Sequence, residues 1–85
     1  MVVLLPTHLR SYSAGVAEVE ARGTTLAEVL ADLDRQFPGV RFRVVDEQDR
    51  VRPHIKFFVG GEQADTLATP VDGQEVQIVA ALSGG

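Results

Sequence analysis

The chain has 85 residues, which accommodates one small domain and excludes two. Its content of 45% hydrophobic and 24% charged residues is typical of a folded protein rather than a disordered one. The absence of cysteine excludes disulfides, thiolate metal sites, iron–sulfur clusters and a cysteine nucleophile. The net charge of -4 disfavours nucleic acid as a partner and favours a basic protein.

The chain lacks the features of a membrane or secreted protein. No apolar run approaches the ~20 residues that a membrane helix needs. Residues 1–6 are not preceded by a basic region or followed by a small-residue cleavage site, so we expect no signal peptide. A cytoplasmic location without membrane association is the resulting expectation.

Two strands are predicted near the start of the chain. The apolar residues 2–5 end at a proline and predict the first strand. In residues 16–21, alanine and valine alternate with glutamate, which predicts a half-buried second strand. Between them, Leu9 is expected to turn inward from a loop.

The clearest helix signal follows at Thr25 and Glu28. This spacing is a capping box, in which the hydroxyl accepts from the third helical amide and the carboxylate accepts from the cap amide. Apolar residues then recur on one helical face, and Pro38-Gly39 ends the pattern, so we predict a helix at about 26–37. The face consists of Leu26, Val29, Leu30, Leu33 and Phe37.

The region after the helix is mixed. In residues 40–54, a few apolar residues stand among many charged ones, and we interpret this region as a loop with some short structure. Residues 55–59 predict a strand, Gly60-Gly61 the tight turn of a hairpin, and residues 62–64 a short return strand.

The last predicted strand is residues 75–80, after turns at 67–70 and 72–73. The tail at 81–85 is expected to be flexible when the protein is alone. The element order predicts an α+β fold, in which a mixed sheet of four to five strands carries one main helix on one face. The first and last strands are expected to lie parallel in its middle. Residues 1–85 then form a single domain.

The residues indicate no active site. His8 and His54 lack the spacing of a metal site, so we expect no bound metal. The carboxylates form two pairs and one group of three, namely Glu18/Glu20, Asp32/Asp34 and Asp46/Glu47/Asp49. A general acid–base pair needs a shaped cleft, and a sheet with one helix offers little room for one. We interpret these carboxylates as solvated surface, and expect neither enzymatic activity nor a bound cofactor.

Several motifs together resemble a known family. They are Leu4-Leu5-Pro6, Leu9-Arg10, residues 25–30, Val51-Arg52-Pro53-His54 leading into residues 55–62, residues 67–73, and the terminal residues 81–85. With them, the chain resembles the ubiquitin-like β-grasp sulfur carriers of the MoaD/ThiS family, in particular the CysO-like carriers. Relatives often carry a proline in the last strand or tail, where this chain has Val79-Ala80-Ala81-Leu82.

The resemblance implies a role for Gly85. In the family, an E1-like enzyme uses ATP to adenylate the C-terminal carboxylate, and sulfur then replaces AMP to leave a thiocarboxylate. The protein would be a co-substrate, monomeric when alone. Its partners would be that E1-like enzyme and a sulfur-accepting biosynthetic enzyme. Cysteine, molybdopterin, thiamin, thiolated tRNA and a thio-sugar product all stay open as acceptors.

The resemblance also assigns roles to the tail, which must thread a narrow channel in a partner. Gly84 and Gly85 carry no side chain that could clash there. Ser83 either forms a hydrogen bond in the channel or acts as a spacer. Leu82 either anchors in an apolar pocket of the partner or folds back on its own sheet.

Strand parity predicts a docking surface. Phe58, Val79 and Ala81 are expected to point away from the helix, and in a β-grasp sheet the first two lie on neighbouring strands. Phe58 and Val79 would then form an exposed apolar patch with an acidic rim for a partner. The alternative is apolar residues scattered over the surface, which is common.

Two other functions stay open. A ubiquitin-like modifier would join Gly85 to a target lysine by an isopeptide bond; the single lysine of this chain, Lys56, argues against elaborate self-chains. A bare binding module with an incidental tail would tolerate deletion of Gly84-Gly85.

Overall fold

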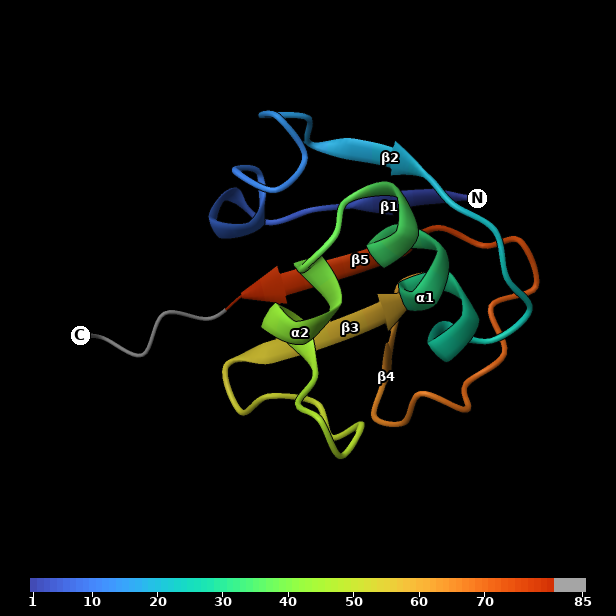
Figure 1. The fold of residues 1–85 in the computed structure, drawn as a ribbon. Helices are drawn as coiled ribbons and strands as arrows, with labels where there is room; N and C mark the ends of the chain where they lie inside the picture. The colour runs from blue at the N-terminus through green and yellow to red at the C-terminus, as the bar shows by residue number, and fades with distance from the viewer. Residues whose placement is uncertain (81–85) are drawn as a thin grey trace.

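The computed structural model describes residues 1–80. The predicted flexible tail, 81–85, lies outside the described residues. The described part has two layers, a sheet and the helices α1 and α2 on one of its faces (Figure 1). The strands are β1 (Val2–Leu4), β2 (Glu18–Glu20), β3 (Ile55–Val59), β4 (Glu62–Ala64) and β5 (Val76–Ala80). The helices are the 3-10 helix η1 (Thr7–Leu9), α1 (Leu26–Gln36) and α2 (Val40–Val44).

The sheet is mixed, with the strand order β2-β1-β5-β3-β4. β1 and β5 are parallel neighbours in its middle, and the other three pairs are antiparallel. The predicted α+β fold, with one main helix on a mixed sheet, is therefore confirmed. The β3–β4 hairpin turns at Gly60 and Gly61, whose φ angles of 58° and 88° are the left-handed values that such a tight turn requires.

The core lies between the sheet and α1. The predicted helix face is confirmed, because Leu26, Val29, Leu30 and Leu33 are all 0% exposed. Leu9 turns inward as expected and is also buried. The helix ends at Gln36, one residue earlier than predicted: half-buried Phe37 precedes a proline, which disfavours helical backbone at that position.

The start of α1 differs in one detail from the predicted capping box. The amide of Glu28 donates to Thr25 Oγ1 at 3.3 Å, as expected. The Glu28 carboxylate instead accepts from the backbone N and the hydroxyl of Thr24, at 2.8 and 2.9 Å. These hydrogen bonds hold the pKa of Glu28 below its ordinary value of 4.5, and the bond from the Thr24 backbone has the larger effect.

The region interpreted as a loop contains a second helix, α2. Its buried residues Val40 and Val44 are spaced four apart and cover the core. The helix begins after Gly39, and Asp34 Oδ1 accepts from the backbone N of Gly39 and Arg41 at 3.0 and 3.1 Å. A face of two valines among arginines is too short to be distinguished from a loop in the sequence.

The first two strands are shorter than predicted. β1 ends at Leu4, and β2 covers Glu18–Glu20 rather than residues 16–21. Val16 lies in the preceding loop and is 47% exposed. The predicted alternation holds within β2, where Val19 is buried between two exposed glutamates.

Candidate functional site

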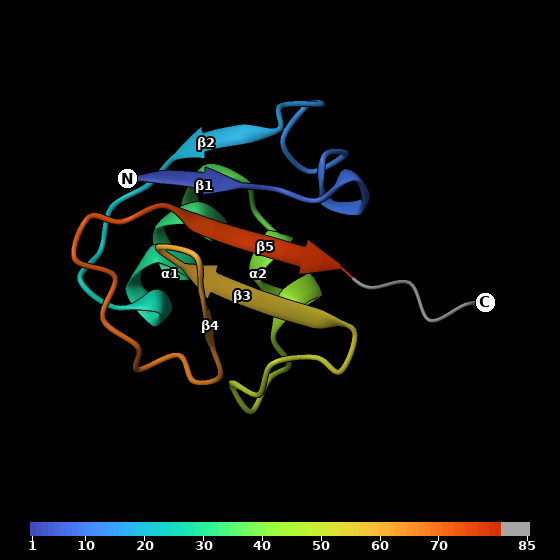
Figure 2. The ribbon, with the colours of Figure 1, turned by 180° about the vertical axis from the view of Figure 1, so that it is seen from behind.

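The candidate site is the end of β5. This strand passes through the middle of the sheet between β1 and β3, and ends at Ala80, the last described residue (Figure 2). The residues predicted to thread and react lie outside the described residues, and their roles stay predictions. They are Leu82, Ser83, Gly84 and Gly85, and Ala81, predicted as part of the docking surface, lies outside them as well.

Phe58 and Val79 lie on the sheet face opposite α1, as strand parity indicates. In the register, Phe58 pairs with Gln77 of β5 and with Gln63 of β4. Strands therefore lie beside it on both sides. Phe58 and Val79 are both half-buried, and their role as an apolar contact for a partner stays a prediction.

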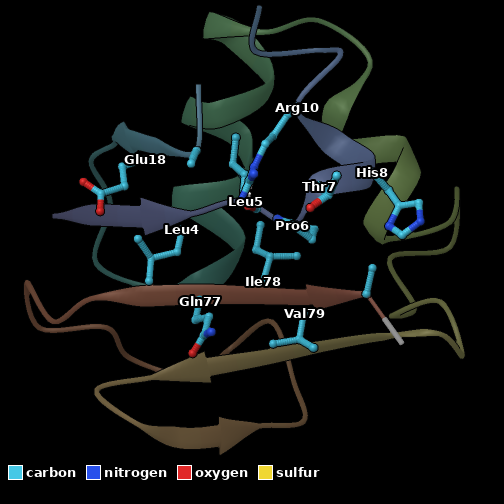
Figure 3. A pocket seen from close by; sticks show the side chains of 12 residues that line it. Leu4, Leu5, Pro6, Thr7, His8, Arg10, Glu18, Gln77, Ile78 and Val79 are labelled. Carbon is cyan, nitrogen blue, oxygen red and sulfur yellow. Dashed lines mark hydrogen bonds between the residues drawn. The ribbon is translucent and has the colours of Figure 1, made fainter. Parts of the chain in front are cut away.

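A first groove of about 490 Å³ lies between β1 and the second half of β5 (Figure 3). Leu4 and Val79 line it from the two strands, and His8 lies beside the end of β5. The other lining residues are Leu5, Pro6, Thr7, Arg10, Ala17, Glu18, Gln77, Ile78 and Ala80.

A second groove of about 430 Å³ meets the first at Ala80 and His8, which line both. Its walls come from η1, from α2 and from the segment that leads into β3. Its other lining residues are Leu9, Phe42, Arg43, Arg52, His54 and Ile55. Phe42 is 53% exposed, so this groove presents an aromatic ring to solvent.

The three arginines that line these grooves, Arg10, Arg43 and Arg52, contact uncharged groups, namely backbone carbonyls and aromatic rings. Arg52 Nε donates to the carbonyl oxygen of Phe42 at 2.7 Å, and its guanidinium lies 4.6 Å from the centroid of that ring. The guanidinium of Arg43 lies 5.6 Å from the ring centroid of Tyr12. Arg10 Nε donates to a backbone carbonyl at 3.4 Å. Such contacts orient an arginine without cancelling its charge.

Within residues 1–80, no group of three histidine, aspartate or glutamate side chains is placed to hold a metal ion. None of the helices in this same part of the chain has the length and apolar character needed to cross a membrane. The three carboxylates with lowered pKa, Glu28, Asp32 and Asp46, are held by structural hydrogen bonds and do not line either groove.

Sequence reasoning missed most of this site. It weighed His8 and His54 as metal ligands and favoured surface or partly packed imidazoles, and it assigned no role to Phe42, Arg43 or Arg52. A signal was present, because Leu9-Arg10 and Val51-Arg52-Pro53-His54 are among the motifs that carry the family resemblance. Their meeting at Ala80 becomes apparent only once the strands are paired.

The chain is similar to known proteins along its whole length. The model of the ThiS family matches residues 3–85. Sulfur carrier protein CysO of Mycobacterium tuberculosis strain H37Rv is 33% identical over 91 residues, an alignment that covers 100% of this chain and 98% of that protein.

Solved structures agree with the fold. A chain in the crystal structure of the Amycolatopsis orientalis BexX/CysO complex matches with a TM-score of 0.90 and 32% identity, over 99% of this chain and 98% of that one. CysO from Mycobacterium tuberculosis, an antigen, matches with a TM-score of 0.88 and 31% identity, over 95% and 98%. Small archaeal modifier protein 1 from Methanosarcina acetivorans has a TM-score of 0.79 at 24% identity over 99% and 94%, a likeness of fold alone.

Proposed function

Because the chain belongs to the ThiS family, we propose that this CysO-like sulfur carrier holds sulfur as a thiocarboxylate on Gly85. The observation that carries the proposal is the full-length similarity to CysO, 33% identity over 100% of this chain. The fold adds support, because β5 leads the chain to the end of the sheet beside two grooves.

The chemistry at Gly85 takes two steps. An E1-like enzyme joins the carboxylate to AMP from ATP and releases pyrophosphate. The sulfur atom of sulfide then attacks the acyl carbon, AMP leaves with the bonding electrons, and loss of the proton on sulfur leaves the thiocarboxylate. Adenylation is needed because a carboxylate resists nucleophiles, whereas AMP is a good leaving group.

The carrier acts as a co-substrate in this proposal. The nucleophile, the base and the nucleotide site belong to its partners, an E1-like adenylating enzyme and a sulfur-accepting biosynthetic enzyme. A CysO is known in complex with a protein named BexX, which supports the idea that such carriers act on the surface of other proteins. Residues 81–85 span at most roughly 17 Å when extended, so the domain itself must contact the enzyme that receives the tail.

Mass spectrometry of the intact protein tests the proposal. With a cognate E1-like enzyme, ATP and a sulfide source, the chain is expected to gain the mass difference between sulfur and oxygen. Deletion of Gly85 withdraws the carboxylate by roughly 3.5 Å, and a misplacement of about 1 Å can already cost ~100-fold in rate. The truncated chain should therefore be almost inert. Val16→Ala is the control, because it changes an exposed side chain outside the tail and outside both grooves.

Two results would contradict the proposal. The first is sulfur gain by the truncated chain; the second is no gain by the intact chain with an enzyme of verified activity. Isopeptide adducts on target lysines, formed without any thiocarboxylate, would indicate a ubiquitin-like modifier instead. Full activity in a host after deletion of Gly84-Gly85 would indicate a bare binding module.

A further inference from the structure

We infer that the end of the sheet docks an acidic segment of the enzyme that receives the tail, an inference that rests on the proposed function. The surface consists of five basic side chains that line the two grooves around Ala80, named here the basic collar. Its members are His8, Arg10, Arg43, Arg52 and His54.

The collar is assembled from three separate segments. His8 and Arg10 come from η1 and the residue after it, Arg43 from α2, and Arg52 and His54 from the segment before β3. Four of them, His8, Arg43, Arg52 and His54, line the second groove with Ala80, where β5 ends. Arg10 lines the first groove, which Ala80 also lines. Any enzyme that takes up the residues after Ala80 must therefore approach the collar.

The collar arginines form no ion pair within residues 1–80. The side-chain ion pairs of this part of the chain involve other arginines, Arg35, Arg41 and Arg50. The collar arginines contact backbone carbonyls and aromatic rings instead. Arg52 contributes to the lowered pKa of Asp46, but the two form no ion pair. Among the described residues that line the grooves, Glu18 is the single acidic one.

This concentration of positive charge opposes the net charge of the chain, which is -4. A nucleic acid would meet repulsion from the rest of the surface, whereas a short acidic protein segment needs to contact only the collar. Phe42, Leu9 and Ile55 give the second groove an apolar wall beside its arginines. At this end of the molecule the complementary partner surface is therefore acidic, contrary to the basic partner that composition alone favours. Matched charges would guide encounter and orientation as the tail enters.

The test titrates three probes into the isotope-labelled full-length chain at low salt. They are an oligoglutamate peptide, an oligolysine peptide of equal length, and an oligothymidylate of equal charge. Oligoglutamate is expected to shift the amide resonances of His8, Arg43, His54 and Ala80. Replacing Arg10, Arg43 and Arg52 together by Gln is expected to weaken its binding about tenfold, since each exposed ion pair contributes modestly.

Matched variants separate charge from fold. The change of Arg22, Arg35 and Arg50 to Gln removes the same charge elsewhere and is expected to leave most of the affinity. Replacement of the three collar arginines by Lys keeps the charge and should retain binding. Equal losses in the collar and control variants, or binding of oligothymidylate as tight as that of oligoglutamate, would overturn the inference. The titration needs neither ATP nor an adenylating enzyme, so its failure would leave the thiocarboxylate proposal standing.

Discussion

Arg52 holds Phe42 by two contacts at once, a hydrogen bond of 2.7 Å from its Nε to the Phe42 carbonyl oxygen and a guanidinium that lies 4.6 Å from the ring centroid. The pair joins α2 to the segment that leads into β3. Because Phe42 is 53% exposed, the arginine shields part of a ring that the short helix cannot bury. One wall of the second groove is thereby fixed beside the end of β5.

Leu30→Ala is expected to lower the free energy of unfolding by roughly 2–5 kcal/mol, because it leaves a cavity in the core. Leu30 is 0% exposed on the inner face of α1. Val16→Ala, at a side chain that is 47% exposed, should change stability by less than about 0.5 kcal/mol. Chemical denaturation measures both. Equal effects of the two variants would mean that this face of α1 is not part of the core.

Elements with a repeated signal could be predicted from the sequence. The inner face of α1 extends over three turns, and the Gly60-Gly61 hairpin rests on a local backbone requirement. α2 could not be predicted, because two valines among arginines fit a loop equally well. Its start also depends on Asp34, which lies in the preceding helix.

The candidate site could be predicted only in part, for a similar reason. Strand parity correctly placed Phe58 and Val79 on the face opposite α1, since orientation alternates along any strand. Their burial depends on which strands lie beside them, which parity does not reveal. The second groove brings together Leu9, Phe42 and Arg52, which are far apart in the chain, and no local pattern encodes that meeting.

Gly23→Ala is expected to destabilise the protein more than Gly61→Ala does. Both residues have positive φ, 157° and 88°, so each variant carries backbone strain. A Cβ on Gly23 would also lie 2.7 Å from the backbone N of Val29, in the first turns of α1, whereas a Cβ on Gly61 meets nothing within 4 Å. Thermal melting of the two variants measures the difference. A lower melting temperature for Gly61→Ala would contradict this reading of the contact.

Acid is expected to destabilise the fold through specific carboxylates. The side chain of Arg35 holds the pKa of Asp32 below 3.8, and the Thr24 amide holds that of Glu28 below 4.5. A pKa lowered by folding contributes stability above the ordinary pKa, and this contribution is lost as the pH falls through the folded value. The free energy of unfolding should therefore decline as the pH drops below these ordinary values.

Urea denaturation between about pH 6 and pH 3 measures this decline, because that range spans the ordinary carboxyl pKa values. Glu28→Gln and Asp32→Asn should each flatten the slope. Glu47→Gln, at an exposed carboxylate without a hydrogen bond among the described residues, serves as the control. If the free energy of unfolding falls with pH as steeply in Glu28→Gln and Asp32→Asn as it does in the control, the hydrogen bonds of these two carboxylates contribute no pH-dependent stability.

Phe58→Asp is expected to weaken binding to the adenylating enzyme. It places a charge on the open face of the sheet, between Gln63 and Gln77, where an apolar contact is proposed. Because Phe58 is only half-buried, the fold should persist, and circular dichroism would verify this. Val16→Asp adds the same charge outside the sheet and is the control. If calorimetry finds the affinity of Phe58→Asp equal to that of the control, Phe58 does not belong to the interface.

The central pairing of β5 has a mechanical consequence. β5 is hydrogen-bonded to β1 on one side and to β3 on the other. Tension applied at Ala80 along the strand loads both ladders in shear, because their hydrogen bonds lie across the direction of pull. Under such a load the hydrogen bonds of both ladders must break together. In a hairpin that is pulled apart from one end, they would instead break one after another. An enzyme that pulls on the C-terminal end of the chain therefore pulls on a strand that is hydrogen-bonded along both edges. The domain can then be withdrawn from the enzyme without unfolding.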